Sequence, residues 1–119
     1  HSELLFGTEL TFNFLTGDAP DRYYQSDSAP IEDNRLGSRG VLEEISHIAA
    51  RDEWQHLEIS FSFSRPARLF RFPVDTVSQS EDGQERVHQG CVVVPCWTLS
   101  EDTSRFSVGL RIDITQPDV

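Results

Sequence analysis

The sequence predicts an all-β fold, an antiparallel β-sandwich of about six to eight strands. Three segments alternate between apolar and polar residues with a period of two, and groups of turn-forming residues separate them. Such alternation gives a strand one buried and one solvated face, which is typical of antiparallel sheets. A chain of 119 residues can bury a single modest core, so we expect residues 1–119 to form one β-sandwich domain.

The alternating segments are residues 10–14, 57–63 and 106–114, in which Leu, Ile, Val and Phe alternate with polar residues or glycine. We expect each to be a strand with its apolar face in the core. Cys91–Trp97 differs because its three consecutive valines are apolar on both faces, as in a central strand. Pro95 lacks a backbone donor and therefore predicts a bulge or the end of that strand.

Turn-forming residues predict where the strands end. The predicted turns are Gly17–Pro20, Ser64–Pro66, Glu81–Gly83 and Ser100–Asp102. Residues 22–40 show no periodicity and predict a long loop, which in a compact domain is usually functional or mobile. Residues 41–50 fit a helical face as well as a strand, and the strands on either side favour the strand.

Composition excludes several kinds of partner. The formal net charge is −10 and all 10 cationic residues are arginine, so we expect no binding to nucleic acid through a basic patch. No apolar run approaches the roughly 18 residues that cross a bilayer, so no membrane partner is expected. Cys91 and Cys96 would point to opposite faces of one strand, which predicts two small buried apolar residues and no disulfide. Cysteine usage leans toward a cytoplasmic location.

No catalytic or metal-binding pattern is complete. His88 could meet Ser78 or Ser80 across a hairpin, but a histidine on the strand surface is the favoured interpretation. Carboxylate pairs can always be drawn among 20 acidic residues, and Glu81–Gly83 lacks the alternating ligand spacing of an EF-hand. We therefore predict no catalytic residue, no metal site and no cofactor.

Carbohydrate recognition is the function that the residue types support best. Sugars stack their apolar CH faces on aromatic rings and pair their hydroxyl groups with acidic, amide and guanidinium side chains. The candidate contacts are Tyr23 and Tyr24, expected to be exposed in the long loop, Trp54 in a turn, Trp97, and the polar residues Gln79, Ser80 and Glu81. Structural roles are the favoured alternatives for the aromatic residues: core positions for both tryptophans and structural positions for the tyrosines. Hydrogen bonding within a turn explains the three polar residues just as simply.

Two parts of the chain resemble a known domain. It is the C-terminal β-sandwich region of family 57 glycoside hydrolases, the α-amylase and 4-α-glucanotransferase group, and the similarity covers most of residues 8–115. The matching residues are Leu10–Leu15, Gly17–Pro20 and Arg22–Tyr24 in the first part, and Phe72–Val74, Thr76–Glu81, Gly83 and His88–Gly90 in the second.

The resemblance implies a non-catalytic piece of a larger multidomain enzyme, part of a galactose-mutarotase-like supersandwich. In that family a separate barrel carries the catalytic carboxylates, and nothing in this sequence matches their motifs. The implied partners are the catalytic barrel of the same chain and an α-glucan, with Thr76–Glu81 as a strand-connecting loop that faces one of them. The alternatives are an autonomous carbohydrate-binding module and a protein-interaction domain with an acidic surface. Packing on a barrel predicts an apolar patch on one sheet face.

Overall fold

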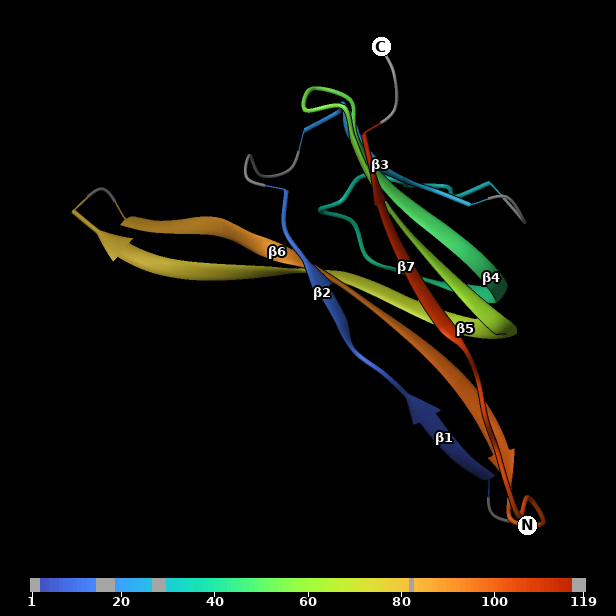
Figure 1. Ribbon diagram of the computed structural model, residues 1–119. Helices are drawn as coiled ribbons and strands as arrows, with labels where there is room; N and C mark the ends of the chain where they lie inside the picture. Colours follow the sequence, from blue (N-terminus) through green and yellow to red (C-terminus); the bar gives the residue numbers. More distant parts are fainter. Residues whose placement is uncertain (1–2, 15–18, 27–29, 82, 117–119) are drawn as a thin grey trace.

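The computed structural model describes residues 3–14, 19–26, 30–81 and 83–116, with the backbone alone for residues 78, 80 and 86–88. The described residues form seven β-strands and no helix, which confirms the all-β prediction. The strands are β1 (Glu3–Gly7), β2 (Leu10–Phe12), β3 (Arg22–Gln25), β4 (Gly40–Asp52), β5 (Leu57–Ser80), β6 (Gly83–Ser100) and β7 (Leu110–Thr115). All of their pairings are antiparallel, in the order β1-β6-β5-β4-β3, with β2 on β6 and β7 on β5 (Figure 1).

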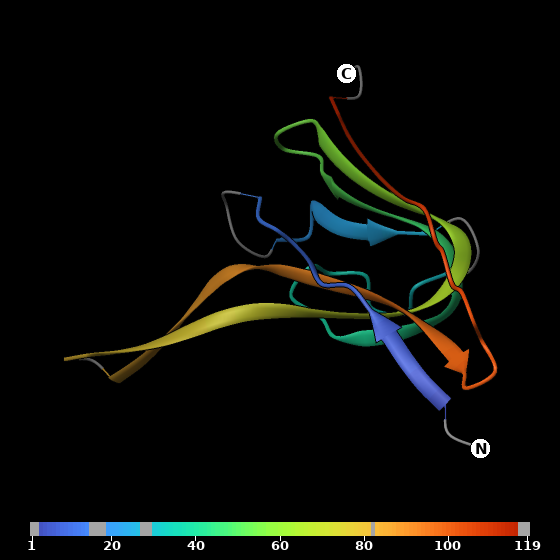
Figure 2. The ribbon, with the colours of Figure 1, turned by 60° about the horizontal axis from the view of Figure 1, so that its bottom comes forward.

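One continuous sheet makes both layers of the sandwich because β4 and β5 bend. The first part of β5, Leu57–Phe63, pairs with β7 and with the second half of β4. From Arg68 onward β5 pairs with β6 in place of β7, and its pairing with the first part of β4 continues to Arg71. β6 carries β1 and β2 on its other edge. Figure 2 shows β5 turning from one layer into the other. Strands that change layers at bulges or bends make the corners of orthogonal β-sandwiches.

The core lies between these two layers. The ring centroid of Phe12, from β2, is 6.1 Å from that of Tyr24 on β3 and 5.9 Å from that of Phe61 on β5. Phe14, Ile59 and Phe63 are buried in the same cluster, so the predicted buried faces of residues 10–14 and 57–63 are confirmed. Burial of this apolar area is the main source of the fold's stability.

Two predicted interruptions are wrong. Ser64–Pro66, predicted as a turn, lies inside β5 at the bend between the layers. Pro95, predicted to end or bulge its strand, pairs with Leu69 in unbroken register. Its carbonyl accepts a hydrogen bond of 3.2 Å from the Thr8 backbone N–H. A proline can stay in a ladder where the partner strand does not require its missing N–H.

The predicted long loop over residues 22–40 contains a strand. Tyr23 and Tyr24 of β3 pair with Arg51 and Ala50 of β4. A strand of four residues is too short to show an alternating pattern, and both its neighbours in sequence are polar, so no periodicity marks it.

Residues 41–50 are strand, as favoured, and lie within β4. The register of β4 against β5 shifts twice, between Leu42 and Ile45 and between Ile45 and His47. Glu44, at the first shift, has a φ of 51°. The first shift places one extra residue in β4, which displaces its alternation by one position and so imitates helical spacing, whereas the second places its extra residues in β5, at the bend.

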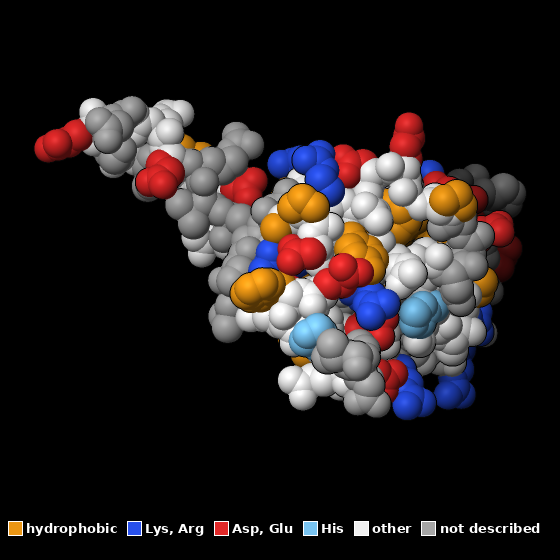
Figure 3. All heavy atoms as spheres, turned by 90° about the horizontal axis from the view of Figure 1, so that it is seen from above, with side chains coloured by type: hydrophobic (Ala, Val, Ile, Leu, Met, Phe, Trp, Pro, Cys, Tyr) orange, Lys and Arg blue, Asp and Glu red, His pale blue; other side chains and the backbone are white. Residues whose placement is uncertain are grey.

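The predicted loop at Thr76–Glu81 is also strand. β5 runs to Ser80, which pairs with Gly83 at the start of β6, so the predicted turn at 81–83 is confirmed in its position. Gly83 has a φ of 114°, which favours glycine. Residues 74–81 and 83–90 thus form a two-stranded hairpin, the β5–β6 arm, which projects from the body and carries acidic side chains (Figure 3). Both faces of the arm meet solvent, so its sequence lacks apolar alternation.

Cys91 and Cys96 are buried and form no disulfide. Within the described ranges there is no helix long and apolar enough to cross a membrane.

Arg71 ties the segment before β4 to the core. Its guanidinium donates one hydrogen bond of 2.7 Å to the Asp33 carbonyl and another to the Ser38 hydroxyl. It lies 5.4 Å above the centre of the Tyr24 ring, and burial lowers its pKa. This segment therefore packs on the core although it has almost no strand structure.

Arg35 closes the same segment through the Asp33 carboxylate, to which its Nε and Nη2 donate at 3.0 and 2.9 Å. These hydrogen bonds, with one from the Arg35 backbone, lower the pKa of Asp33 to about 2. We expect Arg35→Gln to raise the Asp33 pKa toward its ordinary value of 3.8, as followed by carboxyl NMR titration. Any contribution of this pair to stability is present above about pH 4 and is lost as the pH falls toward 2.

The matched control is Arg105→Gln, which removes the same charge from an exposed position after β6. It should leave the Asp33 titration unchanged. Equal shifts in both variants would show that net charge, and not the hydrogen bonds, lowers the Asp33 pKa.

Candidate functional site

The predicted carbohydrate contacts lie in three separate places. Two of the predicted contact residues are in the core: Tyr24 is 1% exposed and Trp97 is 6% exposed. The expected exposure of Tyr24 is therefore wrong, because β3 directs this ring between the layers. Burial beside the Cys91 thiol raises the pKa of the Tyr24 hydroxyl. The core position favoured for Trp97 is confirmed.

Tyr23 and Trp54 lie at one end of the molecule. The Tyr23 hydroxyl donates a hydrogen bond of 2.7 Å to Glu53 Oε1, and this bond raises its pKa. Trp54 is 72% exposed in the turn between β4 and β5, so the core position favoured for it is wrong. A turn residue outside both layers has no core to enter.

Gln79, Ser80 and Glu81 lie at the tip of the β5–β6 arm. Gln79 pairs with Gln84, and Gln79 and Glu81 are exposed. The side chain of Ser80 is outside the described residues. The structure thus does not assemble the seven predicted residues into one site.

A different feature emerges at the edges of the sheet, where the core opens to solvent. Leu110, Ile112 and Ile114 of β7 pair with Phe63, Phe61 and Ile59, whose side chains are buried. Paired residues of antiparallel strands share a face, so the β7 residues extend the core surface. They are nevertheless 40–68% exposed, so the predicted burial of this strand's apolar face is wrong. The alternation predicts the strand correctly, but its apolar face stays exposed because no other strand among the described residues covers β7.

β1 is exposed in the same way on the other layer. Phe6 lies opposite Trp97 and stacks on it with ring centroids 6.2 Å apart, yet it remains about half exposed. Phe106 contacts both rings, at 6.3 Å from Phe6 and 6.2 Å from Trp97. A cavity of about 420 Å³ adjoins the rings of Phe6 and Phe106. We name the side chains of Phe6, Phe106, Leu110, Ile112 and Ile114, of which Phe106 is half-buried and the others are exposed, the apolar seam.

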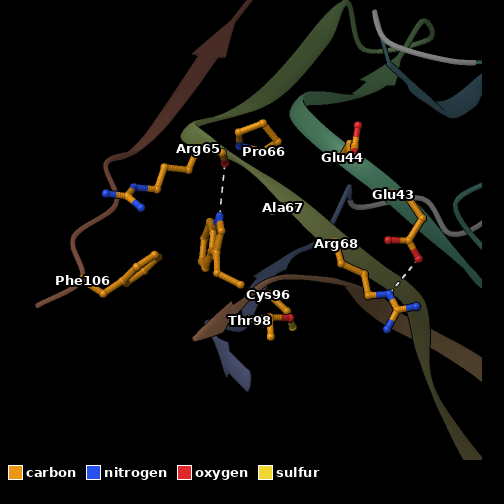
Figure 4. Close-up of a pocket in the computed structure, with 10 residues that line it drawn as sticks. Glu43, Glu44, Arg65, Pro66, Ala67, Arg68, Cys96, Thr98 and Phe106 are labelled. Atoms are coloured by element: carbon orange, nitrogen blue, oxygen red, sulfur yellow. Dashed lines mark hydrogen bonds and ion pairs between the residues drawn. The ribbon is translucent and has the colours of Figure 1, made fainter. Parts of the chain in front are cut away.

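A second hollow, the corner pocket, forms where β4 and β5 change layers. Arg68 is the first β5 residue paired with β6, opposite Cys96, and the residues of β5 before it bend away. The space left beside Trp97 and Thr98 has a volume of about 520 Å³. Arg65 and Phe106 line one side, and Glu43 and Arg68 the other (Figure 4). Glu44, in the bulge of β4, also lines it.

Hydrogen bonds and stacking hold the walls of the corner pocket. Arg68 Nε donates to Glu43 Oε1 at 2.7 Å, and the Arg65 guanidinium lies 4.9 Å above the centre of the Phe106 ring. The Trp97 indole donates to the Arg65 carbonyl at 3.2 Å, which fixes the bend of β5. Burial raises the pKa of the Cys96 thiol in the floor, so this thiol is a poor nucleophile.

The described side chains include no group of three or more His, Cys, Asp or Glu residues that could hold a metal ion. The features that the structure does form are an apolar seam and a mixed polar and aromatic pocket. The fold and these features define the chain as a bent, antiparallel β-sandwich domain with apolar side chains exposed along its edge strands.

The particular family follows from comparison with known sequences. The family model described as "Alpha-amylase/4-alpha-glucanotransferase, C-terminal" matches residues 1–110, so the chain belongs to this family and the resemblance seen in the sequence is confirmed. Alpha-amylase 1 of Dictyoglomus thermophilum (strain ATCC 35947 / DSM 3960 / H-6-12) is 34% identical over 98 residues. That alignment covers 76% of this chain but only 12% of the relative. No solved structure matches the chain.

Proposed function

We propose that this chain acts as a non-catalytic domain of a longer α-amylase or 4-α-glucanotransferase. It packs on the catalytic domain of the same protein and helps to shape the binding of α-glucans. The family assignment and the small share of the relative that the chain covers support this proposal. The apolar seam is the observation that carries it.

The seam suits a permanent contact within one protein better than a free surface. Monomeric proteins rarely leave contiguous apolar side chains open to water, and those of β1 and β7 are direct continuations of the core. Removing them from water would contribute about 25 cal/mol for each Å² that is covered. Edge strands that remain open also invite aggregation, which a docked domain prevents.

Ile114→Asp tests this packing role, because Ile114 is 68% exposed and its replacement should change the stability of the isolated chain by only about 0.5 kcal/mol. In the longer protein the new carboxylate would be buried against an apolar contact. The contact should then weaken by at least about 2 kcal/mol, and calorimetry should show the β-domain melting separately and earlier.

Thr115→Asp is the control, because it adds the same charge to the next residue of β7, which is exposed on the opposite face. It should leave the calorimetric trace of the longer protein unchanged. Equal effects of the two variants, or no effect of Ile114→Asp, would contradict packing through the seam.

An autonomous carbohydrate-binding module is the second candidate function. The observation in its favour is Trp54, 72% exposed beside the Tyr23–Glu53 hydrogen bond. An exposed indole offers the flat apolar face on which a sugar ring stacks. This version requires that maltooligosaccharides change the NMR signals of Trp54 in the isolated chain.

A further inference from the structure

We infer that the corner pocket is a binding site for a neutral, linear α-glucan segment. The choice of an α-glucan rests on the proposed function, whereas the pocket and its chemistry come from the structure. None of the polar residues that line it belongs to the contacts predicted from the sequence.

The size and shape of the pocket fit a short oligosaccharide. Its volume of about 520 Å³ lies in the range of about 300–1,000 Å³ that is usual for small-ligand sites. The two sides differ in chemistry: a guanidinium stacked on a ring at Arg65 and Phe106, and an ion pair at Glu43 and Arg68 (Figure 4). The exposed Thr98 hydroxyl lies between them.

The charges of the lining point to a neutral ligand rich in hydroxyl groups. Arg65 and Arg68 are balanced by Glu43 and Glu44, so the lining has no formal net charge. Guanidinium groups supply fixed pairs of donors and carboxylates supply pairs of acceptors, and together they satisfy adjacent sugar hydroxyls. The half-buried Phe106 and the exposed Pro66 offer the apolar contact that the CH face of a sugar needs.

Two irregularities of the backbone shape the pocket: the bulge of β4 at Glu44 and the bend of β5. The bulge with Glu44 in left-handed conformation brings two acidic side chains to one wall, and the bend of β5 opens the floor. Bulges of this kind often lie next to functional sites, where they re-aim a side chain.

The pocket also adjoins the apolar seam, since Phe106 lines both the pocket and the cavity beside Phe6. A domain that covers the seam would therefore stand at one border of the pocket. Ligand sites occur preferentially at such domain boundaries. A glucan bound here would run along the border between the two domains.

The test uses the chain with Trp54→Phe, which leaves Trp97 in the pocket lining as the single tryptophan of the two. Titration with maltoheptaose should change the Trp97 fluorescence, and the fit gives a dissociation constant. Arg68→Gln removes a charged donor and its ion pair with Glu43, and should weaken binding about tenfold or more.

Arg111→Gln is the matched control, because it makes the same substitution and also breaks an ion pair. The Arg111 Nε lies 2.9 Å from Asp113 Oδ2 on the exposed strand β7, compared with 2.7 Å between Arg68 and Glu43. It should change the dissociation constant by less than about twofold, as expected for an exposed pair outside the site. Inorganic phosphate should not compete with maltoheptaose. Competition by phosphate, equal loss in both variants, or no binding at millimolar sugar would overturn the inference.

These outcomes are separate from those that test the packing role. If maltoheptaose does not bind the corner pocket, Ile114→Asp should still lower the melting temperature of the β-domain in the longer protein. If Ile114→Asp has no such effect, maltoheptaose can still bind the pocket. NMR shifts confined to Trp54 and Tyr23 would overturn the inference and favour the autonomous module instead.

Discussion

Asp52→Ala is expected to lower the free energy of unfolding by about 3–5 kcal/mol. The Asp52 side chain is fully buried and its Oδ2 accepts a hydrogen bond of 3.0 Å from Arg22 Nε. Its Oδ1 accepts a second bond of 3.0 Å from the Gln55 backbone, which closes the turn after β4. The substitution leaves the Arg22 charge, itself 7% exposed, without its buried partner, and Asp21 supplies only a half-exposed contact at 3.1 Å.

Urea unfolding followed by circular dichroism measures this loss. Asp113→Ala is the comparison, since it breaks the exposed pair with Arg111 and should cost less than about 1 kcal/mol. Replacing Arg22 and Asp52 together with leucine should recover most of the stability, because no buried charge remains uncompensated. Equal costs for Asp52→Ala and Asp113→Ala would show that the buried pair has no special role.

Trp97→Ala is expected to cost about 3–5 kcal/mol, the usual range for truncating a buried aromatic side chain. The Trp97 ring packs against Phe6, Phe63 and Phe106, with the ring centroids 6.0–6.2 Å apart. Its indole also holds the bend of β5 through the Arg65 carbonyl. A domain of this size has a total stability of about 5–15 kcal/mol, so the variant should lose a large fraction of its stability and melt well below the unchanged chain.

Trp54→Ala provides the contrast, with an expected change within about 0.5 kcal/mol because its ring is in solvent. Thermal melting of the two variants separates them at once. Should the two substitutions cost the same, the assignment of Trp97 to the core and Trp54 to the surface would be wrong.

The fold class could be predicted from the sequence because the alternation in residues 57–63 reports directly on a half-buried strand. The errors arise where a strand lacks one solvated and one buried face. The β5–β6 arm is wet on both faces, and β3 is too short for a period. Ser64–Pro66 bends its strand without ending it, which turn propensity alone does not distinguish.

The candidate site could not be predicted because its residues come together only after the sheet bends. Glu43, Arg68 and Phe106 belong to distant parts of the sequence, and no spacing rule connects them. The alternation of β7 was visible, but whether its apolar face is covered depends on the position of the strand at the edge of a layer. Residue types alone indicate which side chains are aromatic, but they do not indicate which of these rings the fold buries.

Amide hydrogen exchange, measured for this chain alone and within the longer protein, tests the packing role most directly. Exchange reports on the local opening of each strand, which a docked domain suppresses. We predict slower exchange of β1 and β7 in the longer protein, with the turn around Trp54 unchanged. Equal exchange of β1 and β7 in the two forms, or protection confined to the Trp54 turn, would contradict a catalytic domain packed on the apolar seam.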